Sequence, residues 1–407
     1  MQLAKWAIRA PSSPTLPDDY QLYNFTSVQS DKAAPISLPS LTPTSARRFE
    51  NPSVKHFRSP QTPTTIGQHA KRQAPLLSLH VSTWSNCQAV GITVPHGVFD
   101  AVGLGLVIRA LDAELTGENW EVPELSESNL LELLRNAAGN VPIATTNTPD
   151  RLQFTGSAKR PWDVVRFLWS AVHERYWQWC TRGDIFVGRA ILERFVKKVK
   201  EEVGEESGGK EWVSTGDVLA AWTVKALFSL EPKGCDSLLL GTLYDFRSTL
   251  SPPPISSLSQ YPHNAIAPIL LPPFSVASLA TTSLSNLALQ HRRAITQQRQ
   301  LGSLLENLTW SETFKPIPGR RSGTVGLVIS NQVRAGLTRT RWGAEEGQVA
   351  GWWEWGLEDV MDHIAAWNEL DDGWVMSIMT RPIRWKALEG ELEKLEKDFS
   401  ECKGVPA

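Results

Sequence analysis

The chain of 407 residues is long enough for two domains, and its 41% hydrophobic and 21% charged residues are typical of a soluble globular protein. Its net charge of −2 gives no electrostatic reason to expect a nucleic-acid or membrane partner. We find neither an apolar run of about 18 residues that would cross a membrane nor the continuous apolar core of a signal peptide. We expect a cytoplasmic enzyme or binding protein, and we expect it to be a monomer.

The cysteines and histidines do not form a metal-binding motif. The four cysteines, Cys87, Cys180, Cys235 and Cys402, are widely spaced and none belongs to a CxxC pair. This spacing argues against a zinc ribbon or a redox dithiol. Acids flank His363, but no second histidine lies at helical spacing from it. We therefore expect no metal ion.

The first half of the chain predicts a hairpin followed by helices. Residues 11–75 are rich in Pro, Ser and Thr and show little periodicity, so we expect extended surface segments. Residues 74–85 and 88–94 predict two antiparallel strands joined by a short turn. A helix is expected from about Asp100 to Glu114, and residues 162–203 are also expected to be helical. The end of that second segment places apolar residues on one face: Ile191, Leu192, Phe195, Val196 and Val199.

Residues 204–211 are rich in Gly and charge, which predicts a solvated linker between two halves. After the linker, Ser214 or Thr215 can cap a new helix, whose first turn contains Asp217. A strand then ends in an Asp-x-Arg that contains Arg247. The remaining expected elements are a helix over 276–305, strands over 323–332 and 373–380, and a helix with Leu388, Leu392, Leu395 and Phe399 on one stripe.

Because strands and helices mix without strict βαβ alternation, we expect an α+β fold of two domains, residues 1–203 and 212–407. Two further features have ordinary explanations. His291 is expected on an exposed helix face. The tryptophan-rich run "GWWEWG", residues 351–356, could stack on a ligand, but packing of its indoles on the second domain is the favoured interpretation.

The stretch "VPHGVFDAVGLGL", residues 94–106, places His96 at the end of a predicted strand and Asp100 at the start of a helix. In one interpretation Asp100 is an ordinary helix-start acid beside a solvent-facing histidine. In the other, His96 is a general base, because neutral imidazole accepts protons near pH 7. Gly103 and Gly105 give the helix a smooth face for close packing. The chain has no G-x-S-x-G, G-x-G-x-x-G or Walker A sequence, so no serine hydrolase or phosphate loop is indicated.

This stretch resembles the H-x-x-x-D motif of the BAHD-type, CoA-dependent acyltransferases, and is closest to their fungal, trichothecene acetyltransferase-like branch. Three segments that resemble other family motifs follow in the family's order: "VSTGDVLAAWTVKAL" at 213–227, "LYDFRSTLSPPP" at 243–254 and "YPHNAI" at 261–266. The last of these resembles the family's Y-x-G-N-A loop, with His263 where glycine is usual. The resemblance covers roughly residues 74 to 400.

The resemblance implies two chloramphenicol-acetyltransferase-like domains with a channel between them, and a role for individual residues. His96 would deprotonate the acceptor, while Asp100 would point away from it and pair with Arg247. Acyl-CoA would bind near Ser214 and Thr215, where a helix N-terminus suits phosphate. Asn264 would line the channel. The side chains of "SNQ", namely Ser330, Asn331 and Gln332, are candidates for contacting the substrate or stabilising the oxyanion.

Two features depart from the family pattern. Its D-F-G-W-G signature corresponds here to "GLTRTRWGAEEG", which lacks the Asp. Fewer residues than usual precede His96, so we expect a shortened first domain.

The expected function is transfer of an acyl group, acetyl above all, from acyl-CoA to the hydroxyl of a hydrophobic specialised metabolite. The alternative is a degenerate family member that uses the same histidine for isomerisation, cyclisation or elimination without CoA. A third and weaker possibility is a binding protein without catalytic activity.

Overall fold

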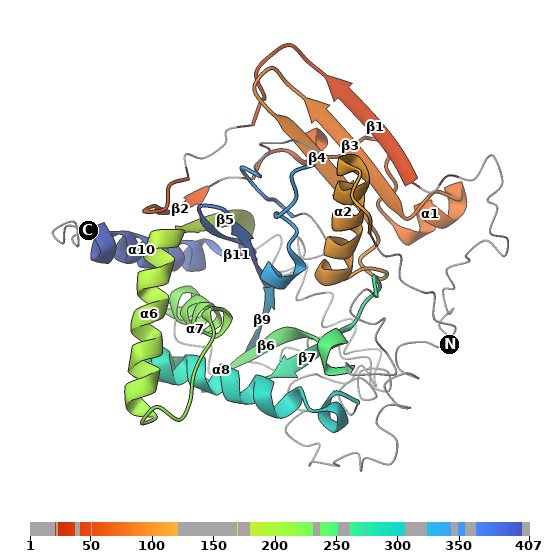
Figure 1. Ribbon diagram of the computed structural model, residues 1–407. Coiled ribbons are helices and arrows are strands. Elements are labelled where there is room, and N and C mark those ends of the chain that lie inside the picture. The colour runs from red at the N-terminus through yellow and green to blue at the C-terminus, as the bar shows by residue number, and fades with distance from the viewer. Residues whose placement is uncertain are drawn as a thin grey trace. The chain divides into compact units, whose positions relative to one another are not determined.

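The computed structural model describes residues 21, 23–36, 41–49, 51–120, 169, 180–230, 237–250, 261–272, 274–305, 324–342, 349–354 and 364–400 (Figure 1). The chain divides into two compact units. The first contains Met1–Ser37 and Pro52–Val98, and the second contains Leu38–Asn51 and Phe99–Ala407. The motif stretch crosses this division, since His96 belongs to the first unit and Asp100 to the second.

The first unit is built on a three-stranded sheet with the order β1-β3-β4. The expected hairpin is confirmed, because β3 (Leu77–Thr83) and β4 (Gln88–Thr93) pair antiparallel. Strand β1 (Tyr23–Gln29) adds to β3 in parallel. The unit also contains the short helices η1 (Val54–His56) and α1 (Ile66–Arg72).

Residues 11–75 were expected to run as extended surface segments, which was wrong where the helices η1 and α1 lie. Strand β1 is extended and largely exposed, but the sequence analysis did not identify it as a strand. In strand β1 the apolar Tyr23 and Phe25 are exposed, whereas the polar Asn24 and Thr26 are half-buried and bond to β3. Asn24 Nδ2 donates to Ser78 Oγ at 3.3 Å, and Thr26 Oγ1 lies 2.8 Å from His80 Nδ1. Only Tyr23 and Phe25 alternate with polar residues, and this pattern is too short to identify a strand from the sequence.

The second unit contains a mixed eight-stranded sheet with the order β2-β5-β11-β10-β9-β6-β7, in which β8 also pairs with β6. Pairs β10–β9 and β6–β9 are parallel and the other pairs are antiparallel. The strand bounds are β2 Ala46–Phe49, β5 Thr181–Gly188, β6 Ser237–Asp245, β7 Ile266–Leu270, β8 Phe274–Ser275, β9 Thr324–Asn331, β10 Ile364–Leu370 and β11 Gly373–Thr380.

Four helices of the second unit pack together beside this sheet (Figure 1). They are α6 (Arg189–Glu206), α7 (Thr215–Phe228), α8 (Leu284–Gln298) and α10 (Pro382–Ser400). A further helix, α2 (Ala101–Thr116), contacts the short helix η5 (Val333–Ala335). The expected apolar stripe of α10 is buried at Leu388, Leu392 and Leu395. The predicted helix over 276–305 forms as η4 (Val276–Ala280) and α8.

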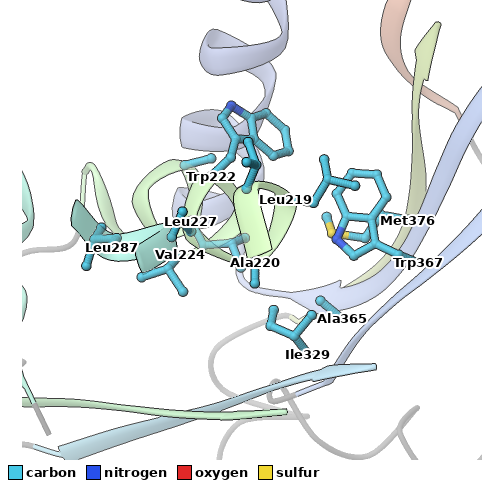
Figure 2. Packing of buried hydrophobic residues seen from close by; sticks show 14 of the residues in the cluster. Leu219, Ala220, Trp222, Val224, Leu227, Leu287, Ile329, Ala365, Trp367 and Met376 are labelled. Carbon is cyan, nitrogen blue, oxygen red and sulfur yellow. The ribbon is translucent and has the colours of Figure 1, made fainter. Parts of the chain in front are cut away.

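Helix α7 is the centre of the hydrophobic core, because it is buried from Asp217 to Leu227 apart from Lys225. A helix that is apolar around its whole circumference is typical of such a buried position. Figure 2 shows its side chains among those of α8 and strands β9, β10 and β11: Leu219, Ala220, Trp222, Val224 and Leu227 with Leu287, Ile329, Ala365, Trp367 and Met376.

The helix expected over residues 162–203 was wrong for residues 181–188, which form β5, and its part before residue 180 lies outside the described residues apart from 169. In β5, Ile185, Phe186 and Val187 are almost fully buried in the sheet. Such a short, continuous apolar run suits a buried strand as well as a helix, so periodicity alone could not distinguish them. The rest of the prediction forms α6, and its apolar face is buried at Ile191, Leu192, Val196 and Val199.

The segment expected to be a linker, residues 204–211, connects α6 to α7, and these two helices contact each other in the second unit. Residues up to Glu206 complete α6, and the chain then turns at Gly208 and Gly209, whose φ angles are 60° and 75°. Glycine suits both positions because it adopts left-handed backbone angles without strain. The assignment of residues 1–203 and 212–407 to two acyltransferase-like domains stays a prediction.

Candidate active site

Asp100 is the N-cap of α2, with its backbone in an extended conformation before the first helical turn. Its Oδ1 accepts a hydrogen bond from the N–H of Gly103 at 2.8 Å, and its Oδ2 accepts one from the N–H of Ala265 at 2.7 Å. The side chain is buried. The buried carboxylate therefore links the start of α2 to the loop before β7.

Arg247 lies beside Asp100 and is equally buried. Its Nη2 is 3.0 Å from Asp100 Oδ1 and 3.1 Å from Oδ2, so the expected pairing of the two residues is present in the structure. Arg247 lies just past the end of β6, at the first residue of η2 (Arg247–Leu250), and not on the strand itself as expected. Arg247 is not on the strand because β6 ends at Asp245.

Arg247 also donates hydrogen bonds to the loop that begins at Tyr261 and to Asp245 at the end of β6. Nε donates to the carbonyl of Tyr261 at 2.9 Å, Nη2 to the carbonyl of His263 at 2.6 Å, and Nη1 to Asp245 Oδ1 at 2.8 Å. Since each N–H of a buried guanidinium needs an acceptor, these contacts fix the loop that carries "YPHNAI". Sequence analysis noted Asp245 as the acid of the Asp-x-Arg but did not predict that it pairs with Arg247.

The loop 261–265 forms a small aromatic group with the residue before Asp100. The ring of His263 lies 5.6 Å from that of Phe99 and 5.4 Å from that of Tyr261, centroid to centroid. Burial raises the pKa of Tyr261, with Arg247 acting in the opposite direction. Asn264, the expected channel residue, is half-buried and directly precedes the Ala265 N–H that binds Asp100.

Two glycines of α2 allow backbone to approach the helix very closely. A Cβ atom at Gly103 would lie 1.7 Å from the carbonyl oxygen of Pro262, and one at Gly105 would lie 2.0 Å from that of Ala335. Arg109 Nη1 also donates to the carbonyl of Ala335 at 2.8 Å. The smooth helix face expected from the sequence is therefore used against the "YPHNAI" loop and η5.

His96 lies in a turn after β4 and is exposed in the first unit. The turn is closed by a hydrogen bond from the N–H of Val98 to the carbonyl of Pro95 at 2.9 Å. The strand does end before the histidine, as expected. The role of His96 as a base stays a prediction.

Ser214 is the N-cap of α7 and forms a capping box with Asp217. Asp217 N–H donates to Ser214 Oγ at 3.3 Å, while the N–H and hydroxyl of Ser214 donate to Asp217 Oδ2 at 2.7 and 2.6 Å. The expected cap is confirmed. Because the Ser214 hydroxyl is used within the box, a phosphate at this helix end would find the N–H groups of Thr215 and Gly216 as its donors.

The carboxylate of Asp217 also binds α8. His291 Nδ1 lies 2.7 Å from Asp217 Oδ1, and Arg292 donates through Nε at 2.7 Å and through Nη2 to Oδ2. Burial tends to raise the pKa of Asp217, but His291, Ser214 and Arg292 hold it below its ordinary value. The expectation of an exposed His291 was wrong, since only 3% of the residue is exposed. Its neighbours in sequence are polar, and nothing local signals a partner 74 residues away.

The "SNQ" residues lie at the end of β9. Ser330 is half-buried, Asn331 is exposed, and the N–H of Gln332 donates to the carbonyl of Trp367 on β10 at 2.8 Å. The amide of Asn331 reaches the first turn of α7, because a Cβ at Gly216 would lie 2.4 Å from Asn331 Nδ2. The structure therefore brings Asn331 next to the predicted acyl-CoA segment.

A groove of about 550 Å³ runs along α6 in the second unit and reaches Thr215. It contains three basic and three acidic side chains, so its charge alone does not select an anion. Its lining residues are Arg189, Leu192, Glu193, Val196, Lys197, Lys200, Glu201, Thr215, Glu369 and Trp374.

Within the described residues, no three His, Cys, Asp or Glu side chains are grouped as a metal site would require. His363, Cys235 and Cys402 lie outside the described residues, whereas Cys87 is half-buried and Cys180 is buried. No described helix is both long and apolar enough to span a membrane.

Comparison with known proteins gives distant relatives, most of which are named acyltransferases or acetyltransferases, although no family model matches the chain. The O-acyltransferase pboC of Aspergillus ustus is 26% identical over 294 residues, which make up 69% of this chain and 58% of pboC. The acetyltransferase adrJ of Penicillium roqueforti is 28% identical over 274 residues, or 64% of this chain and 52% of adrJ. The chain thus spans little more than half the length of these curated relatives.

Solved structures show the fold. TRI101 of F. graminearum, in complex with coenzyme A and T-2 mycotoxin, gives a TM-score of 0.61 at 14% identity, covering 91% of this chain and 80% of TRI101. Vinorine synthase gives a TM-score of 0.51 at 13% identity, covering 91% of this chain and 76% of the synthase. The predicted α+β fold of the chloramphenicol-acetyltransferase type is therefore confirmed. The fold and the relatives together confirm that the chain resembles the BAHD-type acyltransferases.

Proposed function

We propose that the protein is an acyl-CoA-dependent O-acyltransferase that acts on a hydroxylated, hydrophobic specialised metabolite, with acetyl as the transferred group. The observation that carries this proposal is the buried Asp100–Arg247 pair, which fixes the chain four residues after His96. The names of the sequence relatives and the shared fold support the same reaction class.

In the proposed reaction His96 removes the proton from the acceptor hydroxyl, and the resulting alkoxide attacks the thioester carbonyl of acyl-CoA. The tetrahedral oxyanion is stabilised by side chains at the end of β9, with Ser330 and Asn331 as the candidates. Collapse of this intermediate breaks the carbon–sulfur bond, and the imidazolium of His96 returns its proton to the departing thiolate. Atoms and charges balance without a metal ion or an acyl-enzyme.

The roles proposed for the other residues follow from their contacts. Asp100 and Arg247 hold the motif and do not touch substrate, because both are buried and each is occupied by the other. Thr215 and Gly216 offer backbone N–H groups to acyl-CoA at the start of α7, close to the Asn331 amide. Asn264 completes the proposed substrate-side residues, whereas the side chain of Gln332 is bonded to Glu354 and Asn368 and is given no contact with substrate in this proposal.

The proposal is tested by calorimetry with acetyl-CoA followed by turnover with hydroxylated hydrophobic acceptors. His96→Gln keeps a polar side chain at the exposed turn but removes the base. We expect it to bind acetyl-CoA like the wild type and to lower kcat by about 10²- to 10⁴-fold. His56→Ala, a change at another histidine of the same unit, is the control and should stay close to wild-type turnover.

Two results would contradict the proposal. Full turnover by His96→Gln would remove His96 from the chemistry. Absence of acetyl-CoA binding by the wild type would exclude the transferase and favour the CoA-independent isomerisation, cyclisation or elimination described above.

A further inference from the structure

The tryptophan-rich segment, residues 351–354 in the described part of "GWWEWG", belongs to the second unit and packs on its sheet. Trp352 contacts a small cluster of buried side chains on the sheet, made of Phe186, Leu370 and Val375. The favoured interpretation of this run, packing of its indoles, therefore holds for Trp352. Glu354, two residues further on, lies beside Gln332, which follows β9, and Asn368 of β10.

Glu354 closes a ring of hydrogen bonds with two amide side chains. Asn368 Nδ2 donates to Glu354 Oε1 at 3.0 Å and to Gln332 Oε1 at 3.2 Å, while Gln332 Nε2 donates to Glu354 Oε2 at 3.3 Å. The indole N–H of Trp352 adds a fourth bond to Glu354 Oε1 at 2.9 Å. Asn368 is only 2% exposed, so its amide depends on these acceptors.

The ring fixes the point at which β9 leaves the sheet. Asn331 is the last residue of β9 and pairs with Trp367, and the next N–H, that of Gln332, donates to the Trp367 carbonyl. Asn331 Oδ1 also accepts from the N–H of Val333 at 3.2 Å. Since Asn331 Nδ2 reaches Gly216, whatever holds Gln332 in place also holds the Asn331 amide against the first turn of α7.

We propose that Glu354 is a positioning residue, which holds the Ser330–Gln332 turn against the start of α7 through Gln332 and Asn368. This inference rests on the proposed function, in which the turn and Thr215 face the acyl thioester. Glu354 itself makes no contact with substrate in this proposal.

A double-mutant cycle at Gln332 and Glu354 tests the inference. Gln332→Glu places a second carboxylate beside Glu354, so that two like charges repel and the amide of Asn368 is their shared donor. Adding Glu354→Gln restores one carboxylate and one amide with the donor and acceptor exchanged. We expect Gln332→Glu to lower kcat about tenfold or more with an unchanged KM for the acceptor, and the double variant to recover most of the loss.

Hydrogen exchange provides a readout that does not depend on turnover. Amides of the first turn of α7, residues 215–218, should exchange faster in Gln332→Glu and return towards wild-type rates in the double variant. Arg48→Ala is the control, because it breaks the Arg48–Glu389 pair in the same unit without touching the ring. It should leave exchange in residues 215–218 unchanged.

The inference is overturned if the single and double variants behave alike, or if faster exchange stays confined to residues 349–354. A wild type without transferase activity would contradict the proposed function, but exchange in α7 would still decide whether Glu354 positions the turn. Rescue in exchange without rescue in kcat would show a purely structural contact and would also overturn the positioning role.

Discussion

Asp100→Ala is the substitution with the largest effect that the site predicts. The carboxylate caps α2 through the N–H of Gly103, binds the N–H of Ala265, and pairs with Arg247. Loss of the cap costs about 1 kcal/mol, and removal of one partner from a buried ion pair costs about 3–5 kcal/mol. Because Arg247 keeps Asp245 as a second acid at 2.8 Å, we expect a total of about 4 kcal/mol.

Arg247→Ala should cost less than Asp100→Ala. The carboxylate of Asp100 keeps two backbone N–H donors after the guanidinium is removed, so its charge remains hydrogen-bonded. We expect a loss of about 3 kcal/mol. The double variant removes both charges, so no buried charge is left without its partner. Its loss should therefore fall short of the sum of the two single losses by about 2 kcal/mol.

The free energy of unfolding, measured by urea titration and far-UV circular dichroism at neutral pH, gives all four corners of this cycle. Asp100→Asn is a useful fifth variant, because it keeps an acceptor for the cap while removing the charge. Additivity of the two single changes within about 0.5 kcal/mol would refute the reasoning. It would mean that the two residues act independently despite their distance of 3.0 Å.

The remaining predictions concern packing and pH. Gly103→Ala should destabilise the protein by about 1–3 kcal/mol, because its Cβ would overlap the Pro262 carbonyl. Gly390→Ala, in the open middle of α10, should instead stabilise it by about 0.5–1 kcal/mol, and the same sign for both variants in urea titrations would contradict the packing argument. Burial raises the pKa of Asp184 from 3.8 to about 7, although the Ser377 hydroxyl donates to it. The folded state therefore binds this proton more tightly, so about 4 kcal/mol of stability present below pH 4 should be lost as the pH rises to 7. Asp184→Asn should flatten this slope, and an unchanged slope would exclude Asp184 as its source.

Helix starts could be predicted because capping chemistry is local. Asp100 and Ser214 are both N-caps, and both bond to an N–H three residues ahead, at Gly103 and Asp217. The β3–β4 hairpin could be predicted for a similar reason, since its two strands are adjacent in the chain. The residues that determine a helix cap or a hairpin lie within a short stretch of sequence, so both can be recognised there.

The parts that sequence analysis missed depend on partners far away in the chain. Strand β5 is buried between β2 and β11, and β11 begins only at Gly373. The sequence near residue 185 therefore does not distinguish a strand from a helix. His291 looked like a surface residue because its buried partner, Asp217, lies on another helix. The pairing of Asp100 with Arg247 was expected only through the family resemblance, because spacing alone cannot join residues 147 positions apart.

The two helices that begin at the candidate site share one electrostatic arrangement. At α2 the N-cap Asp100 accepts from the N–H of Gly103, and at α7 Asp217, in the first turn, accepts from the N–H of the N-cap Ser214. Each carboxylate is also paired with an arginine from a later segment, Asp100 with Arg247 and Asp217 with Arg292. The helix dipole favours the acid, and the arginine then removes most of its net charge. An anionic substrate can therefore approach these helix ends without meeting an unpaired carboxylate. At α7 this leaves Thr215, Gly216 and the Asn331 amide to make the contacts, which is why the position of the β9 turn matters to the proposed acyl-CoA site.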